Sequence, residues 1–133
     1  MSLTNKEIVE HFFTEIYNKK NYAAAHTLFT PNYRDNGPDQ ARSPEDAIEI
    51  FKGAHRAFPD LHVAVLDLFA EGDKVAFRGR FRGTHRSEFA GVAATNRPVD
   101  FEALEVFRLE AGKIAESWGY WPDALIVRQL QRL

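Results

Sequence analysis

The fold of this chain is decided by two stretches that alternate between apolar and polar residues: residues 75–85, VAFRGRFRGTH, and residues 99–109, VDFEALEVFRL. Successive side chains of a β-strand point to opposite faces of a sheet, so a period of two predicts long strands. In the first stretch the two phenylalanines share one face and the three arginines occupy the other. Two shorter alternating stretches, residues 61–68 and 114–121, complete a predicted antiparallel meander.

Helical patterns precede these strands. Thr4 and Glu7 have the spacing of a capping box and are followed by apolar residues at helical spacing. The sequence predicts helices over about residues 4–18, 21–28 and 43–58, with Pro31 ending the second helix, a brief strand at 33–36 and a closing helix after Pro122. We therefore expect one α+β domain spanning residues 1–133, with the helices laid on one face of a curved sheet.

Composition narrows the possible functions. Seventeen basic and nineteen acidic residues leave a formal charge of −2, which argues against a nucleic-acid partner. The chain has no cysteine, and its five histidines never take the spacing that places two metal ligands on one helix face, so no metal site is expected. No apolar run approaches the roughly 20 residues of a membrane span and no export signal is recognisable, so we expect no membrane partner and a cytoplasmic location.

Glu105 is the first candidate for a catalytic group. It shares the alternation of Phe101, Ala103 and Phe107, which places a carboxyl group on a strand face that is otherwise apolar. Burial there would raise its affinity for a proton, as suits a general acid or base. The alternative is a slipped register or a bulge that turns Glu105 to solvent or to an arginine.

Other residues could complete a cavity around Glu105. His85, on the phenylalanine face of its strand, is a candidate proton shuttle or hydrogen-bond donor, and His55, on the apolar face of the third helix, is another. Tyr33, Phe51 and Trp118 are candidate substrate-binding aromatics that could clamp a flat ligand. For each, the alternative is an ordinary core position, and an ideal last strand puts Trp118 and Trp121 on opposite faces.

The arginines of residues 78–86 and Arg97 form a basic patch that could attract an anionic substrate. Acidic residues at 100, 102 and 116 offer cross-strand partners, which favours a solvated surface or a dimer interface instead.

Six short motifs occur in order along the chain: FPDL at residues 58–61, AEGDKV at 70–75, GTHRSEF at 83–89, VFRL at 106–109, GKI at 112–114 and QL at 129–130. With this series the sequence resembles the SnoaL-like polyketide cyclases of the nuclear transport factor two-like superfamily. The resemblance covers nearly the whole chain. It implies a cone-shaped curved antiparallel sheet wrapped around N-terminal helices, a hydrophobic pocket between helices and sheet, and dimerisation through the sheet. It also implies ring closure by an intramolecular aldol reaction without metal or cofactor.

The resemblance also locates two catalytic positions. The acid–base aspartate of these cyclases lies seven residues after the glycine of the GKI turn, and here that position is Gly119. The assisting histidine of the family corresponds to Glu105. The chain is therefore expected not to be a standard anthracycline aldol cyclase. We expect Gly119→Asp to place a second carboxyl group beside the ligand, across from Glu105.

The leading hypothesis is a cofactor-free acid–base enzyme that acts on a small hydrophobic carbonyl compound or ester, as a cyclase, isomerase or dehydratase does. Glu105 and His85 would be catalytic. One alternative is a noncatalytic module that binds a small hydrophobic molecule, and another is a dimeric accessory domain. A buried, unpaired carboxyl group at Glu105 favours the enzyme, an entirely apolar pocket the binding module, and a filled core the accessory domain. A homodimer is expected because one sheet face is left for an isologous contact.

Overall fold

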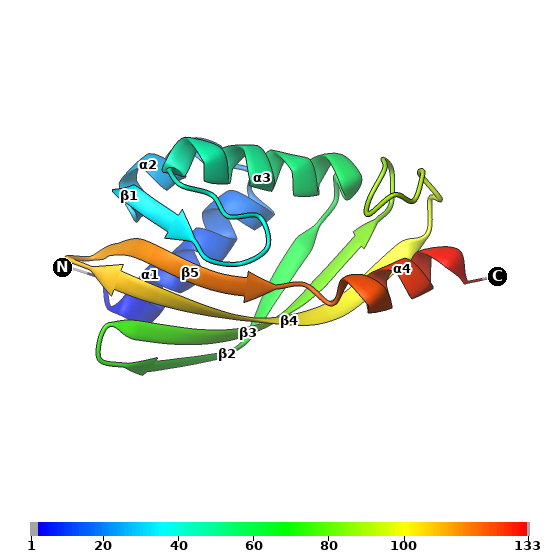
Figure 1. The fold of residues 1–133 in the computed structure, drawn as a ribbon. Coiled ribbons are helices and arrows are strands. Elements are labelled where there is room, and N and C mark those ends of the chain that lie inside the picture. The colour runs from blue at the N-terminus through cyan, green and yellow to red at the C-terminus, as the bar shows by residue number, and fades with distance from the viewer. Residues whose placement is uncertain (1–2, 133) are drawn as a thin grey trace.

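The computed structural model describes residues 3–132. It contains helices and one five-stranded sheet, as Figure 1 shows. In chain order the elements are α1 (Asn5–Phe12), the π-helix η1 (Phe13–Asn18), the 3-10 helix η2 (Tyr22–Ala24), α2 (Ala25–Leu28), β1 (Phe29–Asp35), α3 (Pro44–Ala57), β2 (His62–Glu71), β3 (Lys74–Thr84), β4 (Pro98–Glu110), β5 (Lys113–Tyr120) and α4 (Asp123–Gln131).

The helices begin where the sequence signals predict. The Thr4 hydroxyl accepts the Glu7 N–H, and the Glu7 carboxylate accepts the Thr4 N–H, which completes the capping box of α1. Ser43 caps α3 through the Asp46 N–H, ahead of a proline at the first helical position. The first predicted helix differs in one respect, because its second half, η1, winds as a π-helix.

The first strand is longer than predicted. It begins at Phe29, directly after α2, and contains Pro31, which the sequence analysis took only as a helix stop. A proline lacks the N–H that a central strand must donate, but β1 is an edge strand of the sheet, and this edge position accommodates it.

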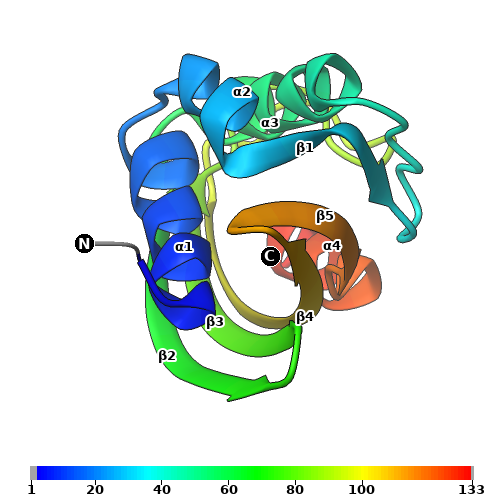
Figure 2. The ribbon, with the colours of Figure 1, turned by 90° about the vertical axis from the view of Figure 1, so that its left-hand side faces the viewer.

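The sheet has the strand order β1-β5-β4-β3-β2, with β1 parallel to β5 and every other pair antiparallel. Seen along the strands, it curls around an interior that α1 and α3 help to cover (Figure 2). The α+β class and the cone-shaped curved sheet expected from the sequence are thus confirmed.

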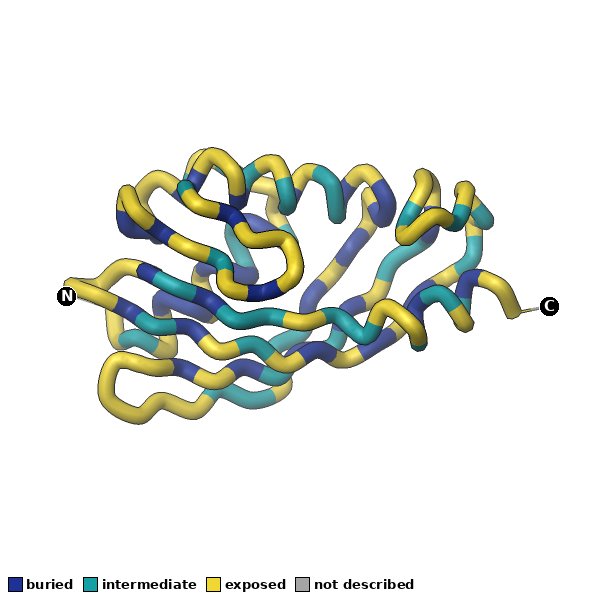
Figure 3. The backbone as a smooth tube through the Cα atoms, in the orientation of Figure 1, coloured by how far each residue is buried: buried dark blue, intermediate teal, exposed yellow. Residues whose placement is uncertain are grey.

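Burial alternates along the central strands, as Figure 3 shows. The inward side chains of β3 and β4 meet the aromatic residues of α1 and η1. Phe13 stacks on Phe77 with 3.9 Å between ring centroids, and Phe81 stacks on Phe101 at 5.2 Å. These contacts form a dense aromatic core at one part of the interior. Within residues 3–132, no helix has the length and apolar character needed to cross a membrane.

Candidate functional site

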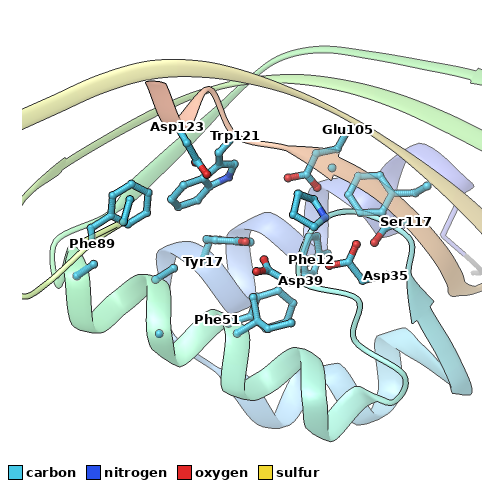
Figure 4. A pocket seen from close by; sticks show the side chains of 18 of the residues that line it. Phe12, Tyr17, Asp35, Asp39, Phe51, Phe89, Glu105, Ser117, Trp121 and Asp123 are labelled. Atoms are coloured by element: carbon cyan, nitrogen blue, oxygen red, sulfur yellow. The ribbon is translucent and has the colours of Figure 1, made fainter. Parts of the chain in front are cut away.

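A pocket of about 430 Å³ lies between the inner face of the sheet and the helices (Figure 4). Its lining comes from α1, η1, the segment around β1, α3, the β3–β4 loop, β4, β5 and the start of α4 with the residues just before it. Two kinds of side chain predominate. The aromatic ones are Phe12, Tyr17, Tyr33, Phe51, Phe89, Phe107 and Trp121, and those that carry a carboxyl group are Asp35, Asp39, Glu88, Glu105 and Asp123.

Glu105 lies on the inner face of β4, directly opposite Gly119 of β5 in the antiparallel register. The missing side chain of Gly119 makes room for it. A Cβ atom added at Gly119 would lie 2.8 Å from Cδ of Glu105, which is closer than real Cβ atoms come, and 3.1 Å from Oε1, which is unusually tight. The Glu105 carboxyl group therefore occupies the space in front of Gly119, which a side chain from β5 would otherwise fill.

Burial among apolar groups raises the pKa of Glu105 from its ordinary value of 4.5 to about 8, and the negative charge of Asp35 adds to the rise. Glu105 is only partly exposed, and it lines the pocket. Within the part of the chain that the structure describes, no side chain or backbone group forms a hydrogen bond or an ion pair with its carboxyl group. At neutral pH Glu105 is therefore a neutral acid that can donate its proton to a ligand.

Tyr17, from η1, supplies a second free polar group. The side chain is only 7% exposed, and Figure 4 shows its hydroxyl directed into the pocket. No hydrogen bond to this hydroxyl exists among the described residues. Burial, together with the charge of Glu105, raises the pKa of Tyr17, so the hydroxyl stays protonated and can only be a donor to an anionic oxygen.

The hydroxyl groups of Tyr33 and Ser117, by contrast, are hydrogen-bond partners of each other. The Tyr33 hydroxyl lies 2.6 Å from Oγ of Ser117, and burial raises the pKa of Tyr33. One of the two hydroxyls donates to the other, so this pair forms a polar but internally bonded part of the wall.

Asp35 ends β1 and lies beside this wall. Its Oδ1 accepts the Gly37 N–H at 2.7 Å, which holds the carboxylate in place. Burial raises the pKa of Asp35, and the charge of Asp39 raises it further, while the bond from Gly37 opposes the rise. Asp35 and Glu105 are thus two carboxyl groups in one pocket with different environments: Asp35 accepts a backbone hydrogen bond and Glu105 has no partner among the described residues.

The remaining carboxyl groups, Asp39, Glu88 and Asp123, are exposed and lie where the pocket opens. No lysine, arginine or histidine is among the lining residues between 3 and 132. Nor does the described part of the chain contain a group of three or more acidic or histidine side chains arranged to hold a metal ion.

Of the predicted site residues, the structure brings Glu105, Tyr33 and Phe51 together in the pocket. His55 is close but is not among the lining residues. Its Nδ1 lies 2.8 Å from the Tyr22 hydroxyl and its Nε2 lies 2.9 Å from the Tyr17 carbonyl oxygen, so both ring nitrogens have partners. Burial lowers the pKa of His55, which favours the neutral, structural form.

His85 is fully buried and is also absent from the pocket lining. Its Nδ1 accepts the Thr95 N–H at 3.1 Å, and its Nε2 has no partner among the described groups. Its ring packs near Phe58, with 5.8 Å between centroids. The alternation of β3 put His85 on the inner face, as predicted, but at the strand's end, where the β3–β4 loop covers it.

Trp118 points the other way. It pairs with Val106 of β4, whose side chain is on the outer face of the sheet. Trp121 lines the pocket instead, because β5 ends at Tyr120 and the chain turns inward before α4. The sequence analysis had recognised that at most one of the two tryptophans could face the pocket, and selected the wrong one.

Sequence reasoning missed Tyr17, Asp35 and Trp121. Tyr17 follows Phe13 at helical spacing and looked like another core position. Asp35 fell within the brief strand predicted at 33–36, just before a loop, and no local pattern indicated that the loop folds back over β5. A Cβ atom at Gly37 would collide with the Gly119 carbonyl oxygen, which shows how closely this loop approaches.

Comparison with known proteins agrees with this fold. The sequence profile of the SnoaL-like polyketide cyclase family matches residues 7–130. No curated protein has a significant sequence match.

Solved structures share the fold over nearly their whole length. TsrD from Streptomyces laurentii is 27% identical with a TM-score of 0.86, covering 96% of this chain and 94% of its own. A protein from Jannaschia sp. CCS1 that is assigned to the same family is 23% identical with a TM-score of 0.89, covering 97% and 92%. A SnoaL-like polyketide cyclase from Agrobacterium tumefaciens C58 is 22% identical with a TM-score of 0.82, covering 97% and 98%. The match of the family profile to nearly the whole chain shows that this protein belongs to the SnoaL-like polyketide cyclase family.

Proposed function

We propose that this protein is an acid–base enzyme that needs no cofactor and removes a proton beside the carbonyl group of a small hydrophobic ketone or ester. The observation that carries this proposal is Glu105, a neutral, unpartnered carboxylic acid on the inner wall of an aromatic pocket. An acid kept neutral at pH 7 by its apolar surroundings can donate a hydrogen bond to a carbonyl oxygen and stabilise the charge that develops there.

Three side chains would take part in the reaction, two as hydrogen-bond donors and one as the base. The carbonyl oxygen of the substrate accepts hydrogen bonds from Glu105 and from the Tyr17 hydroxyl, neither of which has a partner in the described part of the chain. Asp35 carries its negative charge while Glu105 is still protonated, because that charge is one cause of the raised pKa of Glu105. Asp35 takes the proton from the carbon beside the carbonyl group, and the two donors hold the enolate oxygen that results.

The enolate then has two outcomes. Its carbon can attack a second carbonyl group of the same molecule, which closes a ring and corresponds to the cyclase name of the family. It can instead recover a proton from Asp35 at another carbon, which would make an isomerase. Because Gly119 offers no side chain, we propose that Glu105 and Asp35 replace the acid–base aspartate expected in an anthracycline aldol cyclase.

Proton exchange tests this chemistry without knowledge of the natural substrate. We expect the wild-type protein to accelerate the exchange of the α-protons of 1-tetralone in D₂O, followed by ¹H NMR. Glu105→Gln should lose most of this acceleration, since the glutamine amide can still donate a hydrogen bond but has no proton to transfer to the enolate oxygen, and proton transfer by a positioned acid typically contributes on the order of 10²–10⁴ in rate. Glu102→Gln is the matched control, because Glu102 lies on the same strand but points to the outer face.

The outcomes separate the candidate functions. Equal exchange by wild type and Glu105→Gln would remove Glu105 from the mechanism. Binding of 1-tetralone without any exchange would favour the noncatalytic binding module, and neither binding nor exchange would favour the accessory domain. His85 is buried away from the pocket. His85→Asn should therefore leave the rate of proton exchange per folded molecule unchanged, even if less of the protein folds.

We further propose that the protein is a homodimer that joins through the outer face of the sheet. Large apolar side chains are exposed there, among them Phe69 (67%), Leu104 (65%) and Tyr120 (57%). Leu104 and Tyr120 are directly opposite each other across β4 and β5, and Val106 and Trp118 form the next pair. Such a strip suits an isologous contact.

Light scattering tests the dimer. We expect about twice the chain mass of 15.2 kDa at micromolar concentration, and about the chain mass for Leu104→Asp, which places a charge in the strip. A wild-type mass of one chain throughout the micromolar range would overturn the dimer proposal.

A further inference from the structure

We propose that the substrate of this pocket is a cation, an aromatic or otherwise hydrophobic carbonyl compound that bears a protonated amine at the end facing the pocket mouth. This inference rests on the proposed function, because it names the substrate class of the same site. Its basis is a row of carboxyl groups that runs from the mouth to the inner wall and has no positive partner among residues 3–132.

The row consists of Asp123, Asp39, Asp35 and Glu105, all of which line the pocket. Neighbours along it repel one another. The charge of Asp39 raises the pKa of Asp123 and that of Asp35, and the charge of Asp35 raises the pKa of Glu105. Each of these pKa values is raised chiefly by burial, and no basic side chain lowers any of them.

The chain does not lack basic residues that could have neutralised this row. Seventeen are present, and several of them form close ion pairs on the outer face of the sheet. Within the part of the chain that the structure describes, no ion pair involves a carboxyl group of the pocket. The unbalanced negative potential of a low-dielectric cleft attracts cations and disfavours anions.

Aromatic rings at the same end of the pocket favour an organic cation. Trp121 and Phe89 are both partly exposed lining residues, with 6.2 Å between their ring centroids, and Figure 4 shows Trp121 beside Asp123. The face of an indole ring attracts an ammonium group, most strongly when water is excluded. A carboxylate next to an aromatic ring is therefore a typical arrangement for an amine and an unusual one for a metal ion.

The Tyr17 hydroxyl is an independent observation that favours a ligand in this pocket. Its side chain is only 7% exposed, and the hydroxyl, directed into the pocket, has no hydrogen-bond partner among residues 3–132, so it is free to bond a molecule that enters. A ligand with a carbonyl oxygen at Tyr17 and Glu105 would satisfy the inner end. An amine on the same molecule would then reach toward Asp39 and Asp123, so the two ends of the pocket select complementary ends of one substrate.

Three probes of nearly equal shape measure the charge preference: 1-naphthylmethylamine, 1-naphthalenemethanol and 1-naphthoic acid, which are cationic, neutral and anionic at pH 7. Isothermal titration calorimetry at low ionic strength should give the tightest binding for the amine, at least about tenfold tighter than the alcohol, and the weakest for the acid. Raising the salt concentration should reduce the difference between amine and alcohol, since exposed carboxylates are screened.

Charge-neutralising variants test where the amine binds. Asp39→Asn and Asp123→Asn should each weaken amine binding by about threefold and leave alcohol binding unchanged. Glu10→Gln removes the same charge from an exposed position of α1 outside the pocket and should change neither. Circular dichroism should show that all three variants are folded.

Three results would each overturn the inference. The alcohol or the acid could bind as tightly as the amine, the amine could fail to bind at millimolar concentration, or MgCl₂ or CaCl₂ alone could bind stoichiometrically. The proposed function is judged separately by proton exchange. Exchange without an amine preference would overturn only the cationic substrate, and an amine preference without exchange would overturn only the acid–base role.

Discussion

The two faces of the sheet treat charge in opposite ways. On the outer face, Arg80 forms two hydrogen bonds with Asp100, and Arg78 bridges Asp67 and Glu102. On the inner face, at the pocket, carboxyl groups lie near one another without a single basic neighbour among the lining residues. The same β4 strand carries both arrangements, with Glu102 outside and Glu105 inside.

The paired charges of the outer face and the unpaired carboxyl groups of the pocket affect stability differently. Exposed ion pairs in water contribute little to stability, and the outer face would be equally soluble with other pairings. Unpaired carboxyl groups in an apolar pocket oppose folding, because burial and mutual repulsion both disfavour their charged forms. A protein that retains them against this cost gives up stability where binding or chemistry needs the groups.

The largest effect expected from the contrast concerns packing. Phe81 is fully buried on the inner face of β3, stacked on Phe101, whereas Phe69 is 67% exposed on the outer face of β2. In the background of Leu104→Asp, which is expected to be monomeric, Phe81→Ala should lower the free energy of unfolding by about 3–5 kcal/mol and Phe69→Ala by no more than about 0.5 kcal/mol in urea titrations. Comparable losses would mean that the outer strip is buried in a stable assembly.

The next effect is a dependence of stability on pH. Because the pKa of Glu105 is raised to about 8, the folded protein binds this proton more tightly than the unfolded chain does. The resulting stabilisation is complete below about pH 4.5 and is lost as the pH rises through about 8. Glu105→Gln, which cannot ionise, should therefore match the wild type at pH 4.5 and exceed it at pH 9, by on the order of a few kcal/mol.

Urea titrations of both proteins at a series of pH values check this expectation. Glu102→Gln, on the outer face of the same strand, is the control and should show no comparable gain at high pH. A Glu105→Gln variant that parallels the wild type at every pH would place the Glu105 carboxyl group in contact with bulk water, and would remove the basis for its acid role.

A third effect tests whether the side chain of Glu105 on β4 occupies the space that a side chain at position 119 of β5 would need. Gly119→Asp was expected from the sequence to add a carboxyl group across from Glu105, but the Cβ atom would lie 2.8 Å from Cδ of Glu105, so the two side chains compete for one space. The single variant should lose stability by about 1 kcal/mol, at the low end of overpacking costs, since the atoms in the way are the flexible end of the Glu105 side chain, which can swing into the pocket. The double variant with Glu105→Gly should recover most of that loss.

Activity should follow the same logic. Gly119→Asp with Glu105→Gly returns a carboxyl group to the β5 position that the family resemblance assigns to the acid–base aspartate, and is the variant in which we expect weak, pH-dependent cyclase activity on aromatic polyketide esters. Robust cyclase activity of the wild-type protein on such esters would contradict the expectation, drawn from Gly119, that the chain is not a standard anthracycline aldol cyclase. A single Gly119→Asp variant as stable as the wild type would show that Glu105 moves aside freely.

The sequence predicted most of the fold because the fold depends on local patterns. Strict alternation located β3 and β4, and the capping signals at Thr4 and Ser43 located two helices. The same alternation placed Glu105 on the inner face. The sequence did not predict features that depend on the path of the chain between elements. One is the length of β1, which tolerates Pro31 because it is an edge strand, and the other is the cover of His85 by the β3–β4 loop.

The pocket was harder to predict for the same reason. Glu105 could be found because a carboxyl group interrupts an apolar period, but Asp35 and Trp121 belong to segments without a period. Asp35 reaches the pocket only because β1 pairs in parallel with β5 from the other end of the chain. Trp118 was selected from its place in a strand, whereas the pocket uses Trp121, the residue just after that strand ends.

The smallest effect, and the most specific, is the coupling between two carboxyl groups of the pocket. Asp35 is one of two causes of the raised pKa of Glu105, and burial is the larger one. Asp35→Asn should therefore lower the pKa of Glu105 without returning it to 4.5, because burial remains. Asp100→Asn, which removes a carboxylate from the outer face, should leave the pKa of Glu105 unchanged. The carbonyl stretch of the protonated acid in infrared difference spectra, assigned through its loss in Glu105→Gln, would follow the titration in each protein.

If Asp100→Asn shifted this titration as much as Asp35→Asn, the two faces of the sheet would share one electrostatic environment. The contrast between paired charges outside and unpaired carboxyl groups inside would then not explain the site.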